Sequence, residues 1–344
     1  MSTEESGVGS GNTARSGRLG QVVAGVDGSP SARTAALWAA AEAARRGRDL
    51  HLVHAADTDR RALFTDAETL QEVREAGRDL LIRTADAVRE RFPGLVVTRE
   101  LGRQEPVAAL LAAAGRKGTI VVGHRGLGGF ATLMLGSVGL GVAGRAEVPV
   151  IVVRGDDERP TDPTGPDGPA HGTVVAAVHD ASDLGWLRLA AAEAEARGAA
   201  LRLVRAGSPF AHPGGAQAPD DLAARIRAAH PGLAVTAHAE SGAGAAGILI
   251  EASRGADLLV AGRGRRTLGL GRALGRVAHA LIHHAHCPVE IVPHAFPDTD
   301  TDTDTDRATA TDPDTDMDPD PAPDPDTGTD VADASGTDGS RGPG

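Results

Sequence analysis

Two stretches with the same pattern decide the architecture of this chain. Residues 21–31 read QVVAGVDGSPS, and residues 173–183 read TVVAAVHDASD. Each stretch is a short apolar run followed by turn-forming residues, which is typical of a buried strand that ends in a loop. The chain therefore contains two segments that begin in the same way.

The similarity between the two segments continues along the chain. WAAAEAARRGRDLHLVHA at 38–55 corresponds to LAAAEAEARGAALRLVRA at 189–206, IVVGHRG at 120–126 to LLVAGRG at 258–264, and AEVPVIVV at 146–153 to AHCPVEIV at 285–292. Four matches in the same order indicate a tandem duplication with a period near 140 to 150 residues.

Within each repeat, short Val/Ile/Leu runs alternate with Ala-rich stretches, the pattern of βαβ units around a parallel sheet that is buried on both faces. In the first repeat this pattern predicts strands near 20–27, 49–55, 95–100, 119–123 and 149–153, and helices near 31–46, 67–92, 104–115 and 136–146. We therefore expect the α/β class, with two tandem doubly wound, Rossmann-like domains that each contain a five-stranded parallel sheet. Such sheets bind ligands at the carboxyl ends of the strands, where the strand order reverses.

Three segments have too little apolar surface to offset the entropy of ordering, and we expect them to be disordered. They are an N-terminal arm at 1–18, a linker at 155–171 and an Asp/Thr/Pro-rich tail at 297–344. The predicted domains are therefore 19–154 and 172–296. Fifteen Asp and two Arg give the tail a formal charge of -13, so the other 296 residues carry +1 of the total of -12. The acidity of the protein belongs to the tail.

Composition excludes several classes of protein. One Cys in 344 residues cannot form an intramolecular disulfide, and residues 1–18 lack the apolar segment of a signal peptide, so we expect a cytoplasmic protein. No run of eighteen apolar residues could span a membrane. With no Tyr and five Phe, an aromatic surface for nucleic acid is not expected. Lys117 is the single lysine and lies outside any GxxxxGK motif, which excludes a P-loop.

A glycine-rich loop follows the strand predicted at 119–123. Its first part is Gly123-His124-Arg125-Gly126-Leu127-Gly128-Gly129, and after residues 130–135 the next predicted helix opens with Gly136-Ser137-Val138. Glycines let the backbone approach a polyphosphate, and a helix start offers unpaired N–H groups and a positive dipole end. Ser137 either donates a hydrogen bond to a ligand or caps the helix. Because glycine also serves tight turns, the loop alone is compatible with a phosphate site or with a structural turn.

The spacing of the loop favours the phosphate site. Two residues separate Gly123 from Gly126, and nine separate Gly126 from Gly136-Ser137. This G-x2-G-x9-G-[S/T] pattern at the end of a fourth strand resembles the ATP-binding signature of the universal stress protein family. VAGVDGSP after the first strand, LHLVHA and LGSVGLGVAGRAEVPVIVV extend the resemblance, which covers both repeats, roughly 260 of 344 residues.

The resemblance implies that the first domain binds ATP, with Mg²⁺ as an accompanying ion. In ATP-binding members the Asp after strand one and the backbone after strand two hold the nucleoside, while the glycine motif holds ribose and phosphates. Adenosine would then contact Gly25, Val26, Asp27 and Ala55. Ribose and phosphates would contact Gly123, His124, Arg125, Gly126, Leu127, Gly128, Gly129, Gly136, Ser137 and Val138. Asp27-Gly28-Ser29-Pro30 is also a good strand-to-helix turn with Ser29 as the cap, and we expect both roles.

The second repeat departs from this pattern. His179 stands at the position of Asp27, and the motif reads Gly262-Arg263-Gly264-Arg265 and then Gly275-Arg276. A side chain in place of the second glycine would obstruct the approach of phosphate to the backbone, so we expect this domain to be scaffold. The alternative is a different anionic ligand, because arginines bind anions as planar forks. Its ligands would be Arg263, Arg265, Arg266, Arg272 and Arg276.

Other candidate sites are weaker. Four histidines and Cys287 within 279–287 have a spacing compatible with zinc, but we favour packing of the last helix and a buried Cys. Trp38 and Trp186 lie in helical patterns and are expected in the core. The Asp-rich tail lacks a shaped turn that would bind Ca²⁺.

We expect a cytoplasmic tandem universal stress protein that binds ATP in its first domain and serves as a stress-response or signalling module. No catalytic residue is assigned, and His124 with Arg125 would support at most slow hydrolysis. The main alternative is a scaffold that uses the fold for dimerisation without nucleotide. An enzyme of the related adenine-nucleotide-binding α/β group ranks last. The resemblance also implies pairing through last strands, so 147–154 and 287–293 would form an intramolecular pseudo-dimer, and a homodimer is the other arrangement.

Overall fold

The structure, a computed structural model, describes residues 20–124, 136–154, 172–207, 219–242, 244–264 and 274–293. The chain divides into two units, Met1–Thr301 and Asp302–Gly344, and all described residues belong to the first. The predicted arm, linker and tail lie outside the described residues. The described residues are therefore those of the two repeats.

The first repeat contains every strand and helix that its sequence predicts. Its elements are β1 (Val22–Gly25), α2 (Pro30–Arg46), β2 (Leu50–Ala55), α3 (Thr58–Arg61), α4 (Ala67–Arg91), β3 (Val97–Gly102), α5 (Pro106–Ala114), β4 (Thr119–Gly123), α6 (Ser137–Arg145) and β5 (Val150–Val153). The prediction missed α3, because a four-residue helix is too short to show a hydrophobic period.

The second repeat follows the same order. Its elements are β6 (Thr173–Val178), the 3-10 turn η1 (Ala181–Asp183), α7 (Leu184–Arg197), β7 (Ala200–Gly207), α8 (Pro219–Ala229), β8 (Val235–Ser241), α9 (Ala245–Ala252), η2 (Ser253–Gly255), β9 (Leu258–Gly262), α10 (Arg276–His284) and β10 (Val289–Val292). The α/β class and the tandem arrangement are confirmed.

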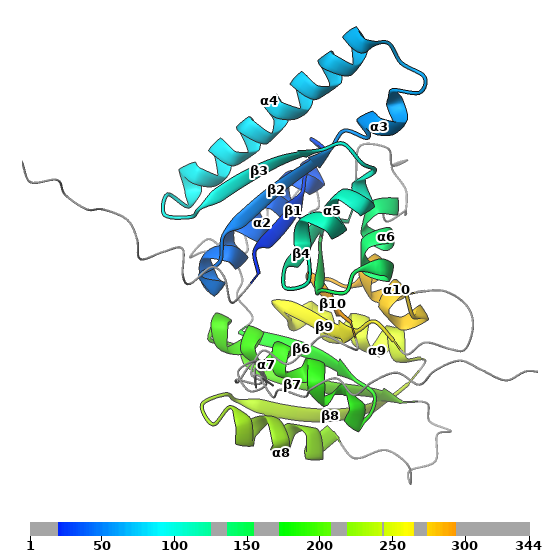
Figure 1. Cartoon of the computed structure of the whole chain (residues 1–344). Coiled ribbons are helices and arrows are strands. Elements are labelled where there is room, and N and C mark those ends of the chain that lie inside the picture. Colours follow the sequence, from blue (N-terminus) through cyan, green and yellow to red (C-terminus); the bar gives the residue numbers. More distant parts are fainter. Residues whose placement is uncertain are drawn as a thin grey trace, which may run out of the picture. The chain divides into compact units, whose positions relative to one another are not determined.

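The strands form one ten-stranded sheet in the order β3-β2-β1-β4-β5-β10-β9-β6-β7-β8 (Figure 1). Each half is a parallel, doubly wound sheet, and its order reverses beside its first strand. The halves join through β5 and β10, which pair antiparallel with Glu290 opposite Ile151. The pairing expected between 147–154 and 287–293 is therefore present, and the two predicted sheets are continuous.

Helices cover both faces of the sheet, so strand residues alternate between two apolar cores. On β1, Val22 and Ala24 join the core beneath α2, α4, α7 and α8, whereas Val23 joins the core beneath α5, α6, α9 and α10. Trp38 and Trp186 are buried in the first core, as predicted. Cys287 is buried in the second, and desolvation raises the pKa of its thiol to about 12, which leaves it unreactive.

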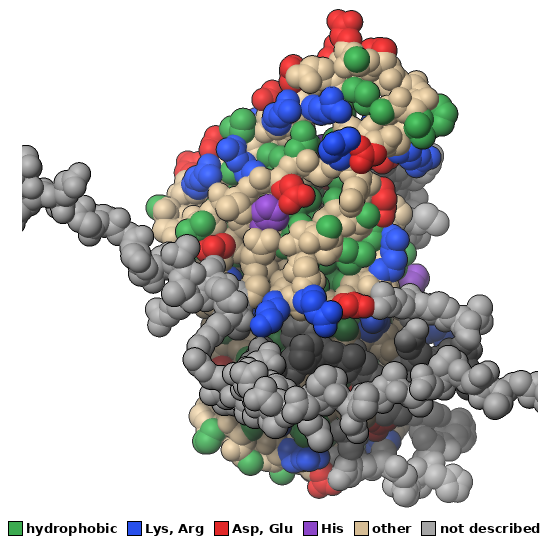
Figure 2. All heavy atoms as spheres, in the orientation of Figure 1, with side chains coloured by type: hydrophobic (Ala, Val, Ile, Leu, Met, Phe, Trp, Pro, Cys, Tyr) green, Lys and Arg blue, Asp and Glu red, His purple; other side chains and the backbone are tan. Residues whose placement is uncertain are grey.

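Charged side chains of both signs share the surface. On the face seen in Figure 2, Lys and Arg lie beside Asp and Glu over α4 and the neighbouring strands, in agreement with the formal charge of +1 outside 297–344. None of the helices in the described part of the chain combines the length and hydropathy that a membrane span requires.

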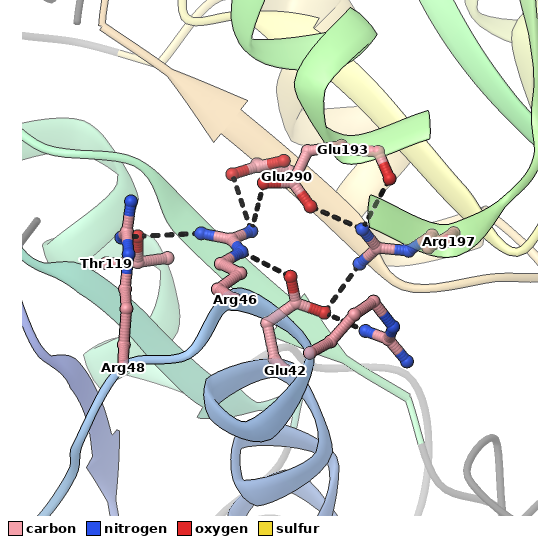
Figure 3. Close-up of polar contacts among 8 residues, drawn as sticks. Glu42, Arg46, Arg48, Thr119, Glu193, Arg197 and Glu290 are labelled. Carbon is pink, nitrogen blue, oxygen red and sulfur yellow. Dashed lines mark hydrogen bonds and ion pairs between the residues drawn. The ribbon is translucent and has the colours of Figure 1, made fainter. Parts of the chain in front are cut away.

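A buried ring of charges joins the C-terminal ends of α2 and α7. Glu42 and Arg46 lie one turn apart on α2, and Glu193 and Arg197 lie one turn apart on α7. Each arginine contacts the glutamate of its own helix and that of the other repeat (Figure 3). All four side chains are at most 7% exposed. Such buried ion pairs are costly to break singly, because each partner left behind is an uncompensated buried charge.

Glu290 of β10 lies beside this ring without a hydrogen bond to any described residue. Its carboxylate is fully buried, and Oε1 is 3.8 Å from Arg46 Nη2. Burial and the neighbouring Glu193 raise the pKa of Glu290 to about 8, although Arg46 opposes the shift. Burial would also raise the pKa of Glu42, but Arg46, Arg197 and Arg45 outweigh it and lower that pKa to about 2. The two carboxyl groups are thus shifted in opposite directions, and Glu290 keeps its proton to a higher pH than Glu42 does.

The raised pKa of Glu290 makes stability depend on pH. The folded chain holds the proton of Glu290 more tightly than a glutamate of ordinary pKa 4.5 does. The contribution of Glu290 to the free energy of unfolding is therefore fully present below pH 4.5 and is lost as pH rises through about 8. We expect Glu290→Gln to gain stability relative to wild type between about pH 5 and about pH 9, measured by urea unfolding. The exposed Glu251→Gln is the control, and an equal pH dependence of wild type and Glu290→Gln would contradict the assignment.

Removal of Arg46 should break the ring. Arg46→Met would leave Glu42 and Glu193 without their shared cation, and we expect the free energy of unfolding to fall by about 3–5 kcal/mol. Arg254→Met is the matched control, because Arg254 pairs with Glu251 on the surface and such pairs contribute at most about 1 kcal/mol. Similar losses in the two variants by chemical denaturation would show that the ring adds nothing beyond a surface pair.

Candidate functional site

The loops predicted to bind nucleotide lie at the carboxyl edge of the first half-sheet. β1 pairs with β2 on one side and with β4 on the other, so the strand order reverses at this point. Val26 continues from β1 and donates its N–H to Val53 O of β2 at 2.9 Å. Ala55 ends β2, and Gly123 ends β4. The fold thus brings together the residues that sequence reasoning selected from three separate segments.

Asp27 forms the turn between β1 and α2. Its Oδ1 accepts the N–H of Ser29 at 2.9 Å, and Ser29 Oγ accepts the N–H of Ala32 at 3.1 Å as the cap of α2. Gly28 has a φ of 90°, a conformation that favours glycine. The structural role predicted for Asp27 and Ser29 is confirmed, and the turn holds the Asp27 carboxylate at the edge of the sheet.

His54, near the end of β2, supports this edge and was not selected from the sequence. Its Nδ1 donates to Val26 O at 2.8 Å, so the residue before Asp27 is held by both β2 and this ring. The ring packs closely on α4, where a Cβ added to Gly77 would lie 2.8 Å from His54 Cδ2. An isolated histidine in a strand carries no sequence signal for such a role.

Gly123 is required for packing against α2. A Cβ added there would lie 2.6 Å from Ser31 Oγ and 2.8 Å from the Ser31 carbonyl, so the first turn of α2 leaves no room for a side chain. The sequence pattern indicates this glycine as an approach point for phosphate, and the structure supplies a packing reason as well. His124 is buried next to it, with Nδ1 3.2 Å from Ser31 Oγ.

The glycine-rich loop is closed at its base by backbone hydrogen bonds. His124 N donates to Val153 O of β5, and Gly136 N donates to His124 O, both at 2.9 Å. Between these two residues, Arg125, Gly126, Leu127, Gly128 and Gly129 lie outside the described residues. Gly136 is the N-cap residue of α6 and makes no side-chain cap, so Ser137 is the first helical residue and not the cap.

The turn at the corresponding edge of the second repeat is organised by Asp183 and Trp186. Asp183 Oδ2 accepts the N–H groups of His179 and Asp180 at 2.6 and 3.1 Å, and Oδ1 accepts Trp186 Nε1 at 3.0 Å. The indole packs on Gly262, whose added Cβ would lie 3.1 Å from Nε1. Sequence reasoning did not assign these roles to Asp183 and Trp186. They replace the turn that Asp27 and Ser29 form in the first repeat, and the scaffold interpretation of this repeat stays a prediction.

The side chain of Arg263, a candidate anion ligand, points to the first repeat. Its Nη1 donates to Ala146 O and lies 3.5 Å from Gly144 O at the end of α6. The described structure therefore shows this guanidinium on backbone carbonyls of the first repeat. Arg276 begins α10, whereas Arg265, Arg266 and Arg272 lie outside the described residues.

The histidines of α10 stack on one another. The ring centroids of His279 and His283 are 4.5 Å apart, and those of His283 and His284 are 5.9 Å apart. Burial lowers the pKa of His283, and the neighbouring His279, His284 and Arg154 lower it further. No group of three or more metal-binding side chains occurs in the part of the chain that the structure describes.

Comparison with known proteins identifies relatives of both repeats. The model of the universal stress protein family matches residues 19–154 and 171–293. Universal stress protein Mb2028c of Mycobacterium bovis is 30% identical over 288 residues, which are 78% of this chain and 95% of the relative. A universal stress protein of Mycolicibacterium smegmatis is 40% identical over 133 residues. That match covers 39% of this chain and 45% of the relative, so the chain spans about half of its length.

A solved structure shows the same fold. The crystal structure of a universal stress protein from Archaeoglobus fulgidus DSM 4304 has a TM-score of 0.61 and covers 79% of this chain and 96% of its own. Its sequence identity of 19% means that this likeness concerns the fold alone.

The close contact at Gly123 predicts a stability effect. Gly123→Ala places a Cβ against the backbone of Ser31, and overpacking of this kind costs about 1–3 kcal/mol. Gly247→Ala is the matched control, because Gly247 lies in α9 with open space around it. The free energy of unfolding of this variant should be unchanged or should rise by about 1 kcal/mol. Chemical denaturation measures both, and an unchanged stability of Gly123→Ala would contradict the packing role.

Proposed function

Because the chain belongs to the universal stress protein family, we propose that its first repeat binds ATP and that the protein is a cytoplasmic, nucleotide-dependent stress-response or signalling module. The observation that carries the proposal is the difference between the two sheet edges. The first repeat presents a turn, two strand ends and a helix start at its switch point. In the second, the turn after the first strand is built differently, with Asp183 bonded to Trp186 and the indole against Gly262.

The adenosine moiety would lie against the ends of β1 and β2. Gly25 and Val26 provide backbone groups there, and Ala55 provides the backbone at the end of β2. Asp27 is half-buried, and its Oδ1 is already oriented by Ser29 N. A carboxylate has four lone-pair sites, so Asp27 can keep this turn and also accept hydrogen bonds from the nucleoside.

The ribose and phosphates would lie against the glycine-rich loop and the start of α6. The N–H groups of Ser137 and Val138 belong to the first turn of this helix, where no side-chain cap occupies them, and the helix dipole favours negative charge. The loop base at His124 and Gly136 holds the two ends of the loop together. Gly126, Gly128 and Gly129 would complete the contacts, and Mg²⁺ would accompany the phosphates.

Binding, rather than hydrolysis, is the proposed activity. His124, the one titratable group of the loop in the described residues, is 5% exposed and faces Ser31 Oγ. It is thus held in the packing between α2 and the loop base, away from the position of a general base. A homodimer would need a surface other than the edges of β5 and β10, because these two strands already pair within the chain. Light scattering of the purified protein would give its oligomeric state.

Nucleotide binding should stabilise the folded chain. With free ATP about 100-fold above its dissociation constant, the full-length protein should gain about 2.7 kcal/mol of unfolding free energy, seen as a higher melting temperature. Gly126→Arg, which copies Arg265 of the second repeat, should abolish the gain because a side chain would block the phosphates. Arg265→Gly is the matched control and should leave the stoichiometry at one nucleotide per chain, because His179 and Arg276 still stand at the positions of Asp27 and Ser137. If ATP, ADP and AMP all leave the melting temperature unchanged, the scaffold alternative replaces the proposal.

A further inference from the structure

The helix that would hold the phosphates is intrinsically weak. α6 reads SVGLGVAGR, with three glycines in nine residues. Each glycine in a helix interior costs about 0.5–1 kcal/mol relative to alanine, and a nine-residue helix is marginal in water even without glycine. α6 therefore depends on contacts from outside itself.

One such contact explains why α6 retains glycine. A Cβ added to Gly141 would lie 2.9 Å from Val107 Cγ2, so α5 packs directly against the backbone of α6. The close approach holds one side of α6 against α5. It also leaves no room for a side chain at Gly141, so no residue of higher helix propensity fits there. It leaves the carbonyl groups at the C-terminal end of α6 in need of partners.

The second repeat provides a partner at that end. Arg263 Nη1 donates to Ala146 O, the carbonyl of the C-cap residue, and lies 3.5 Å from Gly144 O. A guanidinium at a helix C-terminus satisfies terminal carbonyls and interacts favourably with the helix dipole. Arg263 and Ala146 are 117 positions apart in the sequence. They come into contact because β5 and β10 pair and join the two repeats.

Arg263 is itself held firmly. Its N–H donates to Val292 O of β10 at 2.9 Å, and its carbonyl accepts the N–H of Gly275 at 3.2 Å. These bonds are the counterparts of those that His124 makes with Val153 and Gly136 in the first repeat. The base of the second repeat's loop is thus intact, although its glycine motif is not, and it presents the guanidinium to α6.

We propose that Arg263 is a positioning residue for the nucleotide site of the first repeat. By holding the C-terminal end of α6, it fixes the direction in which the N–H groups of Gly136, Ser137 and Val138 point at the other end. This inference rests on the proposed function of that site. The second repeat would then contribute to binding without a ligand of its own, because Arg263 at the base of its loop supports the site of the first repeat.

A reciprocal contact offers a matched control. Arg154, which follows β5, donates from Nη1 to His283 O near the end of α10. α10 reads RVAHALIHH, contains no glycine and belongs to the second repeat. Arg154 therefore makes the same kind of contact across the same interface, but on the helix of the repeat with no proposed nucleotide site.

The test compares full-length Arg263→Met, Arg263→Lys and Arg154→Met with wild type. Calorimetric titration gives the affinity for ATP, and amide hydrogen exchange of residues 136–146 without nucleotide reports the stability of α6. We expect Arg263→Met to bind ATP about three- to tenfold more weakly and to exchange faster in α6, because a cation at the helix end is lost. Arg263→Lys should recover part of both, and Arg154→Met should match wild type in both.

Failure of the positioning role can be told apart from failure of the proposed function. ATP affinity of Arg263→Met within twofold of wild type, or an equal loss in Arg154→Met, would overturn the positioning role. If wild type binds no nucleotide, the proposed function fails, and the amide exchange of α6 then decides whether Arg263 stabilises this helix. Faster exchange in Arg263→Met alone would show that Arg263 stabilises α6, and unchanged exchange would overturn this. Should Arg263→Met not fold, the same comparisons apply to Arg263→Lys.

Discussion

The antiparallel pairing of β5 with β10 is the contact on which the rest of the structure depends. Each of these strands is the last of its half-sheet, and all four residues of each are buried. Left alone, each would be an apolar edge with unpaired backbone groups, which is prone to aggregation. Pairing the two removes both edges at once. It also sets the two repeats in an orientation that brings identical positions of the duplicated sequence face to face.

This orientation produces contacts between the two repeats on both faces of the joined sheet. On one face, the Glu and Arg that the duplication placed one turn apart on α2 and α7 meet, and each of Arg46 and Arg197 lies between two glutamates. On the other, Arg263 and Arg154 each reach the end of a helix in the opposite repeat. Glu290 breaks the symmetry, because its opposite in β5 is Ile151. Burial and the neighbouring Glu193 raise the pKa of Glu290, which disfavours a third negative charge beside the ring.

The two repeats have diverged at the turn that follows the first strand of each half-sheet. In the first, Asp27 forms a tight turn, Ser29 caps α2, and the small Ser31 lies against Gly123. In the second, Asp183 accepts two backbone N–H groups of the turn and bonds to Trp186, whose indole lies against Gly262. The duplicated turns therefore have different hydrogen-bond patterns although the strands and helices around them are the same.

The sequence by itself determined the elements, the duplication and the turn at Asp27 and Ser29. These rest on short-range patterns, since apolar periodicity and capping act within a few residues. It also predicted the pairing of the last strands through the family resemblance. The site residues themselves stay predictions, and Arg125 to Gly129 lie outside the described residues.

Only the tertiary structure decided how distant residues combine. The ion pair of Glu42 with Arg197, the packing of Trp186 on Gly262 and the contact of Arg263 with α6 join elements that are far apart in the sequence, where no local pattern predicts them. Even Gly123, which its motif had singled out, has a packing role that appears only when α2 lies against β4. The physical reason is the same throughout: burial and charge pairing depend on what the fold places nearby, and that is set by the pairing of β5 with β10.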